Sequence, residues 1–329
     1  MRNTLHVILV LMLLAACGGK EAADSAAAES NAAAESNAAT ESTAPASTEP
    51  PRQTLEEAVD NGGAEAFMAS AMAHARASVG ITTLEAINAE LRPHDRLFKP
   101  EGDGPFPAVL FFHGCSGPTA SHEDDWAEFY NSINVVMIAV NSYAGRDIDW
   151  NDACNAKVMT PWQRAADVLA TVAYARTLDY VDSDALVLSG FSHGAMTIWQ
   201  SQVFASTKEA PISLASWPEG AMDGVRLSFP FYGTCSGRWT APISTTAFLG
   251  DNDRYIDEQS CIDYAAANNE VKGADMKSLF SYRVFEGATH TFDHARPNKA
   301  NVDAGSVYDA AATTEAQQTI AAAIAQLKK

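Results

Sequence analysis

A serine flanked by glycines carries the clearest chemical signal in the sequence. Ser192 lies in GFSHG, with Gly190 and Gly194 two residues to either side, after the apolar run ALVL and before a helical pattern. A strand-to-helix turn of this kind lifts a hydroxyl out of the sheet edge, and it needs glycines because strand and helix approach closely. The motif therefore predicts Ser192 as a nucleophile. The competing interpretation is a glycine-rich turn with a capping serine.

A serine hydroxyl attacks a carbonyl only with help from a base, and the base needs an orienting acid. When the nucleophile lies on such a turn, the chain order is serine, acid, histidine. Beyond the GFSHG motif the sequence has two histidines. His290 follows the last predicted strand and is the predicted base, whereas His294 is expected at the surface. Asp251 and Asp253, in LGDNDRYI, both qualify as the acid.

An oxyanion hole requires two backbone donors aimed at the developing negative charge. The residue after the nucleophile, His193, is expected to supply one N–H. The loop FFHGCSG is expected to supply the other, through Cys115, because its glycines let it turn closely. His113 in this loop is predicted to be a hydrogen-bonding scaffold residue rather than a proton carrier.

The elements that must position these residues alternate along the chain. Strands are predicted at 108–114, 135–143, 185–190, 224–233, 243–250 and 280–290, and helices at 162–178, 195–204, 257–269 and 314–327. This alternation is typical of an α/β fold with a mostly parallel sheet and helices on both faces. Such sheets carry their chemistry at the carboxyl ends of the strands, where all the candidate residues lie.

The N-terminal third shows a different pattern. A charge at Arg2, an apolar run and LAAC at 14–17 predict a secretory signal, residues 1–17, whose end resembles the bacterial lipobox. Cys17 would then be lipidated, and the absence of an aspartate after it favours the outer membrane, on its periplasmic or surface face. Residues 18–53 include a tandem AAAESN repeat and predict a disordered tether. The remaining 54–329 suit one domain, with 54–87 as a helical cover.

Composition excludes several function classes. The formal net charge of −19 argues against nucleic acid as a partner, since such partners need a basic surface. Apart from Cys17 there are four cysteines, an even number that predicts two disulfides in an exported protein, and they lack the spacing of a structural zinc site. No phosphate loop, nicotinamide fingerprint or metal-ligand cluster is present in the sequence, so no cofactor and no metal are expected.

Five motifs together resemble the dienelactone hydrolase family of α/β-hydrolases: FFHGCSG, GFSHGAM, FYGTC, LGDNDRYIDEQSC and FEGATHTFD. They occur in the family's order over roughly residues 90–329. The resemblance implies the α/β-hydrolase fold and a hydrolase activity. Founding members have a cysteine nucleophile where this chain has Ser192, and the proline usual after the acid motif is replaced by Ile256-Asp257. Both departures point to a broader, esterase-like branch.

The resemblance also implies site residues. Asp253 has the G-x-x-D spacing of the family's acid and the family's distance to the cysteine at 261, so we expect it to complete the triad, while Asp251 bonds amides of its own turn. We pair Cys115 with Cys154 and Cys235 with Cys261, which would pin loops near the strand ends, and the resemblance supports the same pairing.

The sequence therefore predicts a serine hydrolase that cleaves carboxylic esters or related acyl bonds through Ser192, Asp253 and His290. The alternatives are a peptidase, a polyester or cell-wall depolymerase with the same triad, and a binding lipoprotein without catalysis. Substrate choice is expected to depend on the shape of a pocket. Five aromatic residues are candidates for its wall, although packing in the core is the favoured role for each: Trp126, Tyr143, Trp162, Trp217 and Trp239.

Overall fold

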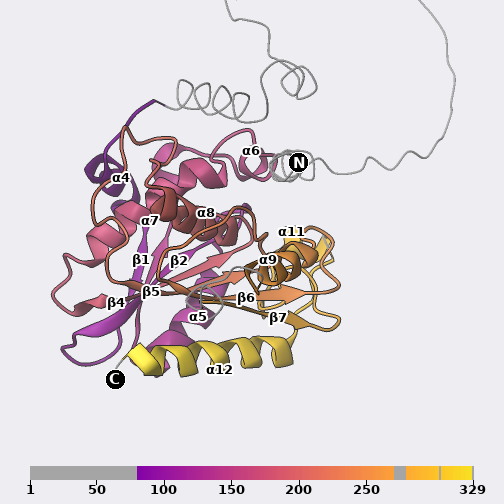
Figure 1. The fold of residues 1–329 in the computed structure, drawn as a ribbon. Helices are drawn as coiled ribbons and strands as arrows, with labels where there is room; N and C mark the ends of the chain where they lie inside the picture. The colour runs from indigo at the N-terminus through magenta and orange to yellow at the C-terminus, as the bar shows by residue number, and fades with distance from the viewer. Residues whose placement is uncertain (1–79, 270–278, 304, 328–329) are drawn as a thin grey trace, which may run out of the picture.

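The protein was analysed as a computed structural model that describes residues 80–269, 279–303 and 305–327. The predicted signal, the predicted lipid attachment at Cys17 and the predicted tether lie outside these residues. So does most of the predicted helical cover. The described chain forms a central sheet between two layers of helices (Figure 1). This is the architecture of an α/β-hydrolase, as predicted.

In the described part of the chain, seven strands form one sheet in the order β1-β3-β2-β4-β5-β6-β7. They are β1 (Arg96–Phe98), β2 (Phe106–Phe112), β3 (Val136–Val140), β4 (Val181–Phe191), β5 (Val225–Phe231), β6 (Ser244–Gly250) and β7 (Phe280–Phe285). Only β1 pairs antiparallel, with β3, and the other neighbours are parallel. The parallel strands therefore end along one edge, where the candidate residues follow β2, β4, β6 and β7.

Both faces of the sheet are buried, which explains the continuous apolar runs. Along β2, Leu110 and Phe112 face one core cluster, whereas Val109 and Phe111 face the other. Helices α4 (Leu84–Leu91), α7 (Pro161–Ala175) and α8 (His193–Thr207) cover the first face, and α5 (Ala120–Ser132) and α12 (Ala310–Leu327) cover the second (Figure 1). The other described helices are α6 (Trp150–Cys154), α9 (Gln259–Asn269), α11 (Lys299–Asp303) and two 3-10 helices, η1 (Arg92–His94) and η2 (Ala144–Arg146).

The structure differs from the predicted elements mainly at their ends. The strands predicted at 108–114 and 280–290 end at Phe112 and Phe285, because the residues that follow form the loops of the candidate site. Helix α5 was not predicted, since its sequence is rich in charges and only Trp126, Ala127 and Tyr130 give it a buried apolar face. Residues 84–87 of the predicted cover are indeed helical, in α4, which packs on α7.

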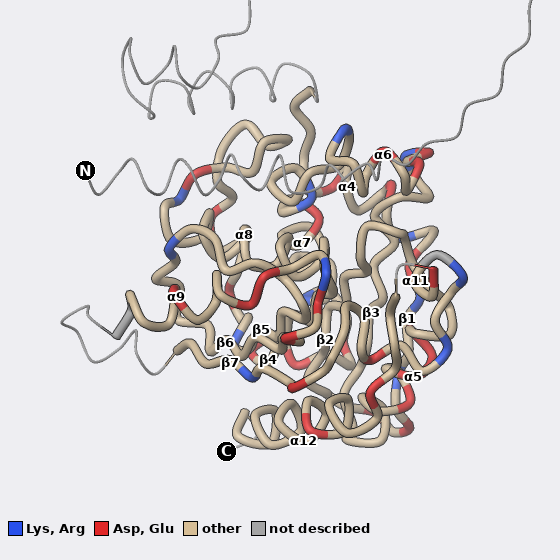
Figure 2. The backbone as a smooth tube through the Cα atoms, turned by 90° about the vertical axis from the view of Figure 1, so that its right-hand side faces the viewer, with Lys and Arg blue, Asp and Glu red and all other residues tan. Residues whose placement is uncertain are grey.

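Charged residues are distributed over many loops and helix ends of the domain, with acidic and basic positions interspersed (Figure 2). This distribution fits a solvated acidic surface rather than a basic patch for nucleic acid. Among the residues that the structure describes, no helix is both long enough and apolar enough to cross a membrane.

Candidate active site

Ser192 occupies a strained turn between β4 and α8. Its φ of 53° and ψ of −114° are a backbone conformation that non-glycine residues rarely adopt. The two flanking glycines are required by close backbone approach. A Cβ at Gly190 would lie 2.4 Å from the carbonyl oxygen of Gly194, and a Cβ at Gly194 would lie 2.1 Å from that of Phe112. The GFSHG spacing therefore encodes this turn, as the sequence predicted.

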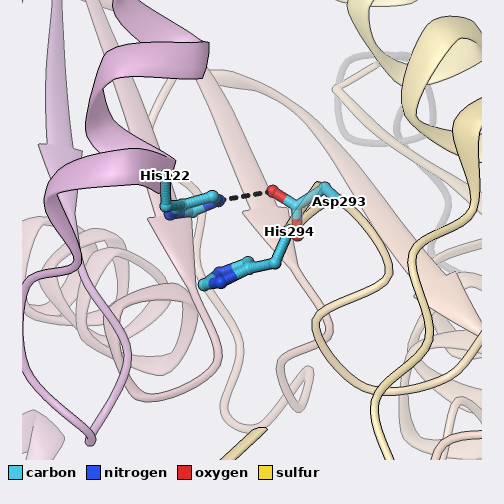
Figure 3. Close-up of side chains that lie close together, drawn as sticks. All are labelled: His122, Asp293 and His294. Carbon is cyan, nitrogen blue, oxygen red and sulfur yellow. Dashed lines mark hydrogen bonds and ion pairs between the residues drawn. The ribbon is translucent and has the colours of Figure 1, made fainter. Parts of the chain in front are cut away.

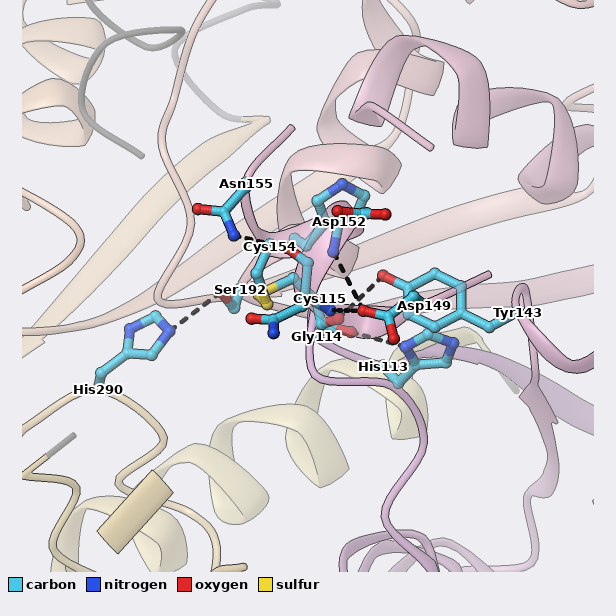
Figure 4. Close-up of a disulfide and its surroundings, with 12 residues drawn as sticks. His113, Gly114, Cys115, Tyr143, Asp149, Asp152, Cys154, Asn155, Ser192 and His290 are labelled. Atoms are coloured by element: carbon cyan, nitrogen blue, oxygen red, sulfur yellow. Dashed lines mark hydrogen bonds between the residues drawn. A yellow bond between two sulfur atoms is a disulfide. The ribbon is translucent and has the colours of Figure 1, made fainter. Parts of the chain in front are cut away.

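The structure brings together Ser192, His290 and Asp253. His290 Nε2 lies 3.0 Å from Ser192 Oγ, and His290 Nδ1 lies 2.7 Å from Asp253 Oδ2 (Figure 4). The carboxylate accepts from Nδ1–H, which leaves Nε2 free to accept the serine proton. The Asp253 side chain is 1% exposed and that of His290 is 14% exposed. The Asp253 carboxylate is therefore shielded from water, whereas the His290 imidazole lines a cavity.

The two candidate acids have different partners. Asp253 Oδ1 accepts from the backbone N–H groups of Tyr255 and Ile256, at 2.8 and 3.1 Å, which orients its other oxygen toward His290. Asp251 Oδ1 accepts from the N–H of Gly287, 2.6 Å away, in the turn after β7. Asp251 therefore ties two loops together, rather than bonding amides of its own turn as expected, and it does not reach the histidine.

The loop after β2 and the start of α8 both lie next to Ser192. His193 is the first residue of α8, where backbone N–H groups have no acceptor within the helix. Gly114, Cys115 and Ser116 line the same cavity as Ser192. These elements are where the two oxyanion donors were expected, and they frame a position next to Ser192 where an oxyanion could bind.

Two disulfides hold the surrounding loops. Cys115 pairs with Cys154 at the end of α6, and Cys235 pairs with Cys261 in α9, the same pairs that the sequence predicted. The first disulfide lies in the cavity wall, and in Figure 4 it and His290 are seen on opposite sides of Ser192. The second fixes the loop after β5 to the helix that follows the acid loop.

His113 is a buried scaffold residue, as predicted. Its Nδ1 donates to the carbonyl oxygen of Gly114 at 2.7 Å, and its Nε2 accepts the N–H of Ser142 at 3.3 Å. Burial, together with the nearby Arg164 guanidinium, holds the pKa of His113 well below its usual value. The imidazole is therefore neutral and serves to shape the loop that carries Cys115.

A cavity of about 480 Å³ opens at Ser192 and His290. Of the five aromatic residues considered for its wall, only Trp162 lines it, and the other four are packing residues, the alternative that the sequence favoured. Trp126 is buried in the core beneath α5, Trp239 packs in a separate cluster around α9, and Trp217 packs against the first core cluster. Tyr143 donates to the carbonyl oxygen of Cys115 from outside the cavity. The other aromatic residues that line the cavity are Trp150, Tyr232, Tyr255, Phe111 and Phe191.

A second histidine–aspartate pair lies beside the cavity and was not predicted. His122 Nε2 lies 2.7 Å from Asp293 Oδ2 (Figure 3). His294 stacks on His122 with ring centroids 3.6 Å apart and is only 7% exposed, so the prediction that it lies at the surface was wrong. The polar sequence around His294 concealed its burial, because the partner ring comes from α5, 172 residues earlier in the chain.

The geometry of this group does not suit a metal ion, although its ligand atoms lie within 4.8 Å of one another. Trp126 Nε1 donates to Asp293 Oδ2 and Tyr232 Oη donates to Oδ1, so both carboxylate oxygens already have donors. The two imidazole rings are nearly parallel, at 22°, and lone pairs in parallel stacked planes do not converge on one ion. These residues instead join α5 to the loop after β7 through hydrogen bonds.

Comparison with known proteins places this fold and site in a family. A family model described as the dienelactone hydrolase family matches residues 94–327. A "Putative Dienelactone Hydrolase" from Klebsiella pneumoniae subsp. pneumoniae MGH 78578 has a TM-score of 0.52 at 17% identity, covering 69% of this chain and 89% of that one. Esterase 2 of Thermogutta terrifontis, phosphoramylated by tabun, has a TM-score of 0.51 at 15% identity, covering 71% and 89%.

At such identities these two structures are alike in fold alone. No curated protein matches the sequence significantly. The family model, however, spans most of the chain and includes every residue of the candidate site. The chain therefore belongs to the dienelactone hydrolase family.

Proposed function

We propose that this protein is a serine hydrolase that cleaves carboxylic esters through an acyl-enzyme on Ser192. The observation that supports this most strongly is the continuous relay from Ser192 Oγ through the His290 imidazole to the Asp253 carboxylate, with contacts of 3.0 and 2.7 Å. Membership of a hydrolase family supports the same reaction class. A capping serine would require neither the strained backbone at Ser192 nor a histidine on its hydroxyl.

The reaction follows from this geometry. Ser192 Oγ attacks the ester carbonyl carbon while its proton passes to His290 Nε2, and Asp253 stabilises the resulting imidazolium through Nδ1–H. The backbone N–H groups of His193 and Cys115 hold the oxyanion. The tetrahedral intermediate collapses, and His290 returns the proton to the departing alkoxide. Water then attacks the acyl-enzyme with the same histidine as base, which releases the acid and frees Ser192 Oγ.

The cavity favours an uncharged ester. In the described parts of the chain, none of the residues that line it is Asp, Glu, Lys or Arg, whereas the whole protein carries a net charge of −19. An anionic acyl group would enter without a cationic partner and would lose its hydration there. Trp150 and Tyr255, which are 44% and 56% exposed, offer apolar contact area at this cavity.

A panel of activated esters tests the proposal. The wild type is expected to hydrolyse p-nitrophenyl butyrate at least tenfold faster, as kcat/KM, than the p-nitrophenyl hemiester of succinate, which has a similar length and a negative charge. The Ser192→Ala variant is expected to hydrolyse neither while unfolding at the wild-type temperature. Full activity in this variant would end the assignment. Release of products only from peptides or solid polyester would instead favour the peptidase or depolymerase alternative.

We also propose that the protein is exported and lipidated at Cys17, on the strength of the LAAC sequence. The two disulfides support this, because disulfides persist in oxidising compartments outside the cytosol. The Cys17→Ser variant is expected to lose metabolic lipid labelling and to move to the soluble fraction. Equal labelling of the variant and the wild type would contradict the proposal.

A further inference from the structure

The core beneath the candidate oxyanion hole contains a buried cation. Arg164 lies on α7, is 0% exposed, and is surrounded on its own helix by buried Ala165, Ala166 and Val168. A fully buried arginine is costly, because its charge is removed from water. Since packing alone is satisfied by an apolar side chain of similar length, the charge requires another explanation.

No carboxylate within the described residues forms an ion pair with Arg164. The nearest acid along the helix is Asp167, and both of its oxygens accept from Arg146. Moreover, Arg164 Nη2 has no hydrogen-bond partner. The Arg164 guanidinium thus has no direct ion-pair partner, and Asp167 acts on it only through space. In this low-dielectric region its charge acts over a longer range than at the surface.

One nitrogen of Arg164, Nη1, contacts both the loop after β2 and the first residue of α8, the two elements next to Ser192. Arg164 Nη1 donates to the carbonyl oxygen of His113 at 2.7 Å and to Nδ1 of the His193 imidazole at 3.2 Å. Arg164 Nε donates to Ser142 Oγ at 2.9 Å. Because arginine has only donors, His193 Nδ1 must be the acceptor, so the proton of this imidazole is on Nε2. Burial and the Arg164 charge lower the pKa of His193 to about 3, which keeps it in this neutral form.

The two acceptors of Nη1 belong to the residues that determine where the oxyanion donors lie. The His113 carbonyl precedes the Gly114–Cys115 peptide, whose N–H is one proposed donor. His193 supplies the other N–H and begins α8. We propose that Arg164 is a positioning residue that ties these two elements together through Nη1, fixes the separation of the two N–H donors, and adds a positive potential behind the oxyanion.

This inference rests on the proposed function, because an oxyanion forms only during acyl transfer. It predicts a specific kinetic signature. Groups that act only on the transition state change kcat and leave substrate binding unchanged, whereas a general loss of folding reduces the number of active sites. Active-site titration with a fluorophosphonate separates the two, since kcat can then be expressed per reactive serine.

The decisive variant is Arg164→Gln, which removes the positive charge and most of the guanidinium N–H donors. We expect kcat per titrated site to fall by about 10²-fold, the size of effect seen when one oxyanion donor is lost, with KM within threefold of the wild type. The inhibition constant of an alkyl boronic acid, which forms a tetrahedral adduct on serine, should rise by a similar factor. The Arg164→Lys variant keeps the charge, but its shorter side chain lacks the planar guanidinium and cannot form the Nη1 and Nε hydrogen bonds together. It should recover part of the loss in kcat.

Arg92→Gln is the matched control. Arg92 is also a partly buried arginine and pairs with Asp95 at 2.7 Å, but it contacts neither loop of the site. This variant should lower the unfolding temperature and leave kcat, KM and boronate inhibition unchanged.

The inference is overturned if Arg164→Gln keeps kcat per titrated site and boronate inhibition within threefold of the wild type, or if its loss lies in KM alone. If Arg164→Gln does not fold, Arg164→Lys decides: a tenfold or larger loss in kcat at unchanged KM supports the inference, and wild-type kcat overturns it. A wild type that hydrolyses no ester contradicts the proposed function itself, whereas an active wild type with an equally active Arg164→Gln contradicts only this role.

Discussion

Two histidine–aspartate pairs lie beside one cavity, and in each a ring nitrogen contacts a carboxylate oxygen, Nδ1 in His290 and Nε2 in His122. His290 contacts Asp253 and His122 contacts Asp293, both at 2.7 Å. They differ in what surrounds the pair. The imidazole of His290 reaches Ser192 Oγ and its side chain is 14% exposed. The imidazole of His122 is stacked under His294 and, among the described residues, contacts no hydroxyl or thiol nucleophile.

The carboxylates differ in the same way. Asp253 uses one oxygen for backbone amides and directs the other at its histidine, so the imidazole can gain and lose a proton against a fixed acceptor. Asp293 accepts from three side chains, of His122, Trp126 and Tyr232, all of them buried. In the proposed mechanism the His290–Asp253 contact is catalytic because Ser192 Oγ lies on the far ring nitrogen, whereas the His122–Asp293 contact is a buried cross-link.

The largest expected effect separates the pairs by activity. Asp253→Asn should reduce kcat by about 10⁴-fold, because the amide favours the wrong tautomer of His290 and does not stabilise the imidazolium. Asp293→Asn should leave kcat per titrated site within threefold of the wild type. Steady-state kinetics on p-nitrophenyl butyrate measure both. Comparable losses in the two variants would remove the distinction between the pairs.

The second effect separates them by stability. Asp293→Asn should lower the free energy of unfolding by about 3 kcal/mol, since it breaks a buried, charged hydrogen-bond network. Asp253→Asn, whose partners include two amides near the surface, should cost less than half of that. Urea unfolding followed by tryptophan fluorescence gives both values. A larger loss at Asp253 would mean that the structural role has been assigned to the wrong pair.

The third effect depends on pH. Burial, reinforced by the neighbouring His122, lowers the pKa of His294 to about 3, far below the ordinary 6.5. The folded protein therefore favours neutral His294. The contribution of this neutral side chain to the free energy of unfolding is complete above pH 6.5 and is lost as the pH falls toward 3. In this window, His294→Gln should make the decline in unfolding free energy shallower by up to about 1.4 kcal/mol per pH unit. Urea titrations at pH 7, 6, 5 and 4.5 test this.

The exposed His94 provides the control for this titration. His94→Gln makes the same exchange at a side chain that lies at the surface. If His294→Gln and His94→Gln give the same slope, His294 does not contribute to acid sensitivity and its burial is not linked to folding in this way.

The smallest effect concerns the carboxylate next to the relay. Asp251 lies two residues from Asp253 but bonds the N–H of Gly287, which keeps the acid loop beside the turn before His290. Asp251→Asn should reduce kcat by about tenfold or less through a looser loop, with no change in the pH profile. A loss as severe as that in Asp253→Asn would reverse the choice of acid.

The sequence predicted the parts of this site that local spacing encodes. GFSHG requires its glycines because of close backbone contacts at a strand-to-helix turn. The order of motifs pointed to His290 and to two acids, Asp251 and Asp253, and the family's spacing selected Asp253, which contacts His290. The parallel strands were recognisable because burial on both faces makes their runs continuously apolar.

The parts that were missed depend on contacts between distant segments. His122 and Asp293 meet across 171 residues, and nothing near either of them distinguishes them from polar surface positions. Most of the aromatic residues expected around the cavity pack elsewhere, because composition does not specify which way a ring points. A signal for Arg164 was present, a lone cation within an apolar helical stretch, but its meaning depends on the loops that it contacts.

Trapping the acyl-enzyme is the most direct test of whether Ser192 is the nucleophile. The wild type and Ser192→Ala would be mixed briefly with p-nitrophenyl acetate, quenched in acid and mapped by peptide mass spectrometry. We expect a gain of one acetyl group on the peptide that contains Ser192, located on that serine, and none at this site in the variant. Turnover by the wild type with no acetyl group on Ser192, or with the acetyl group on another residue, would contradict it.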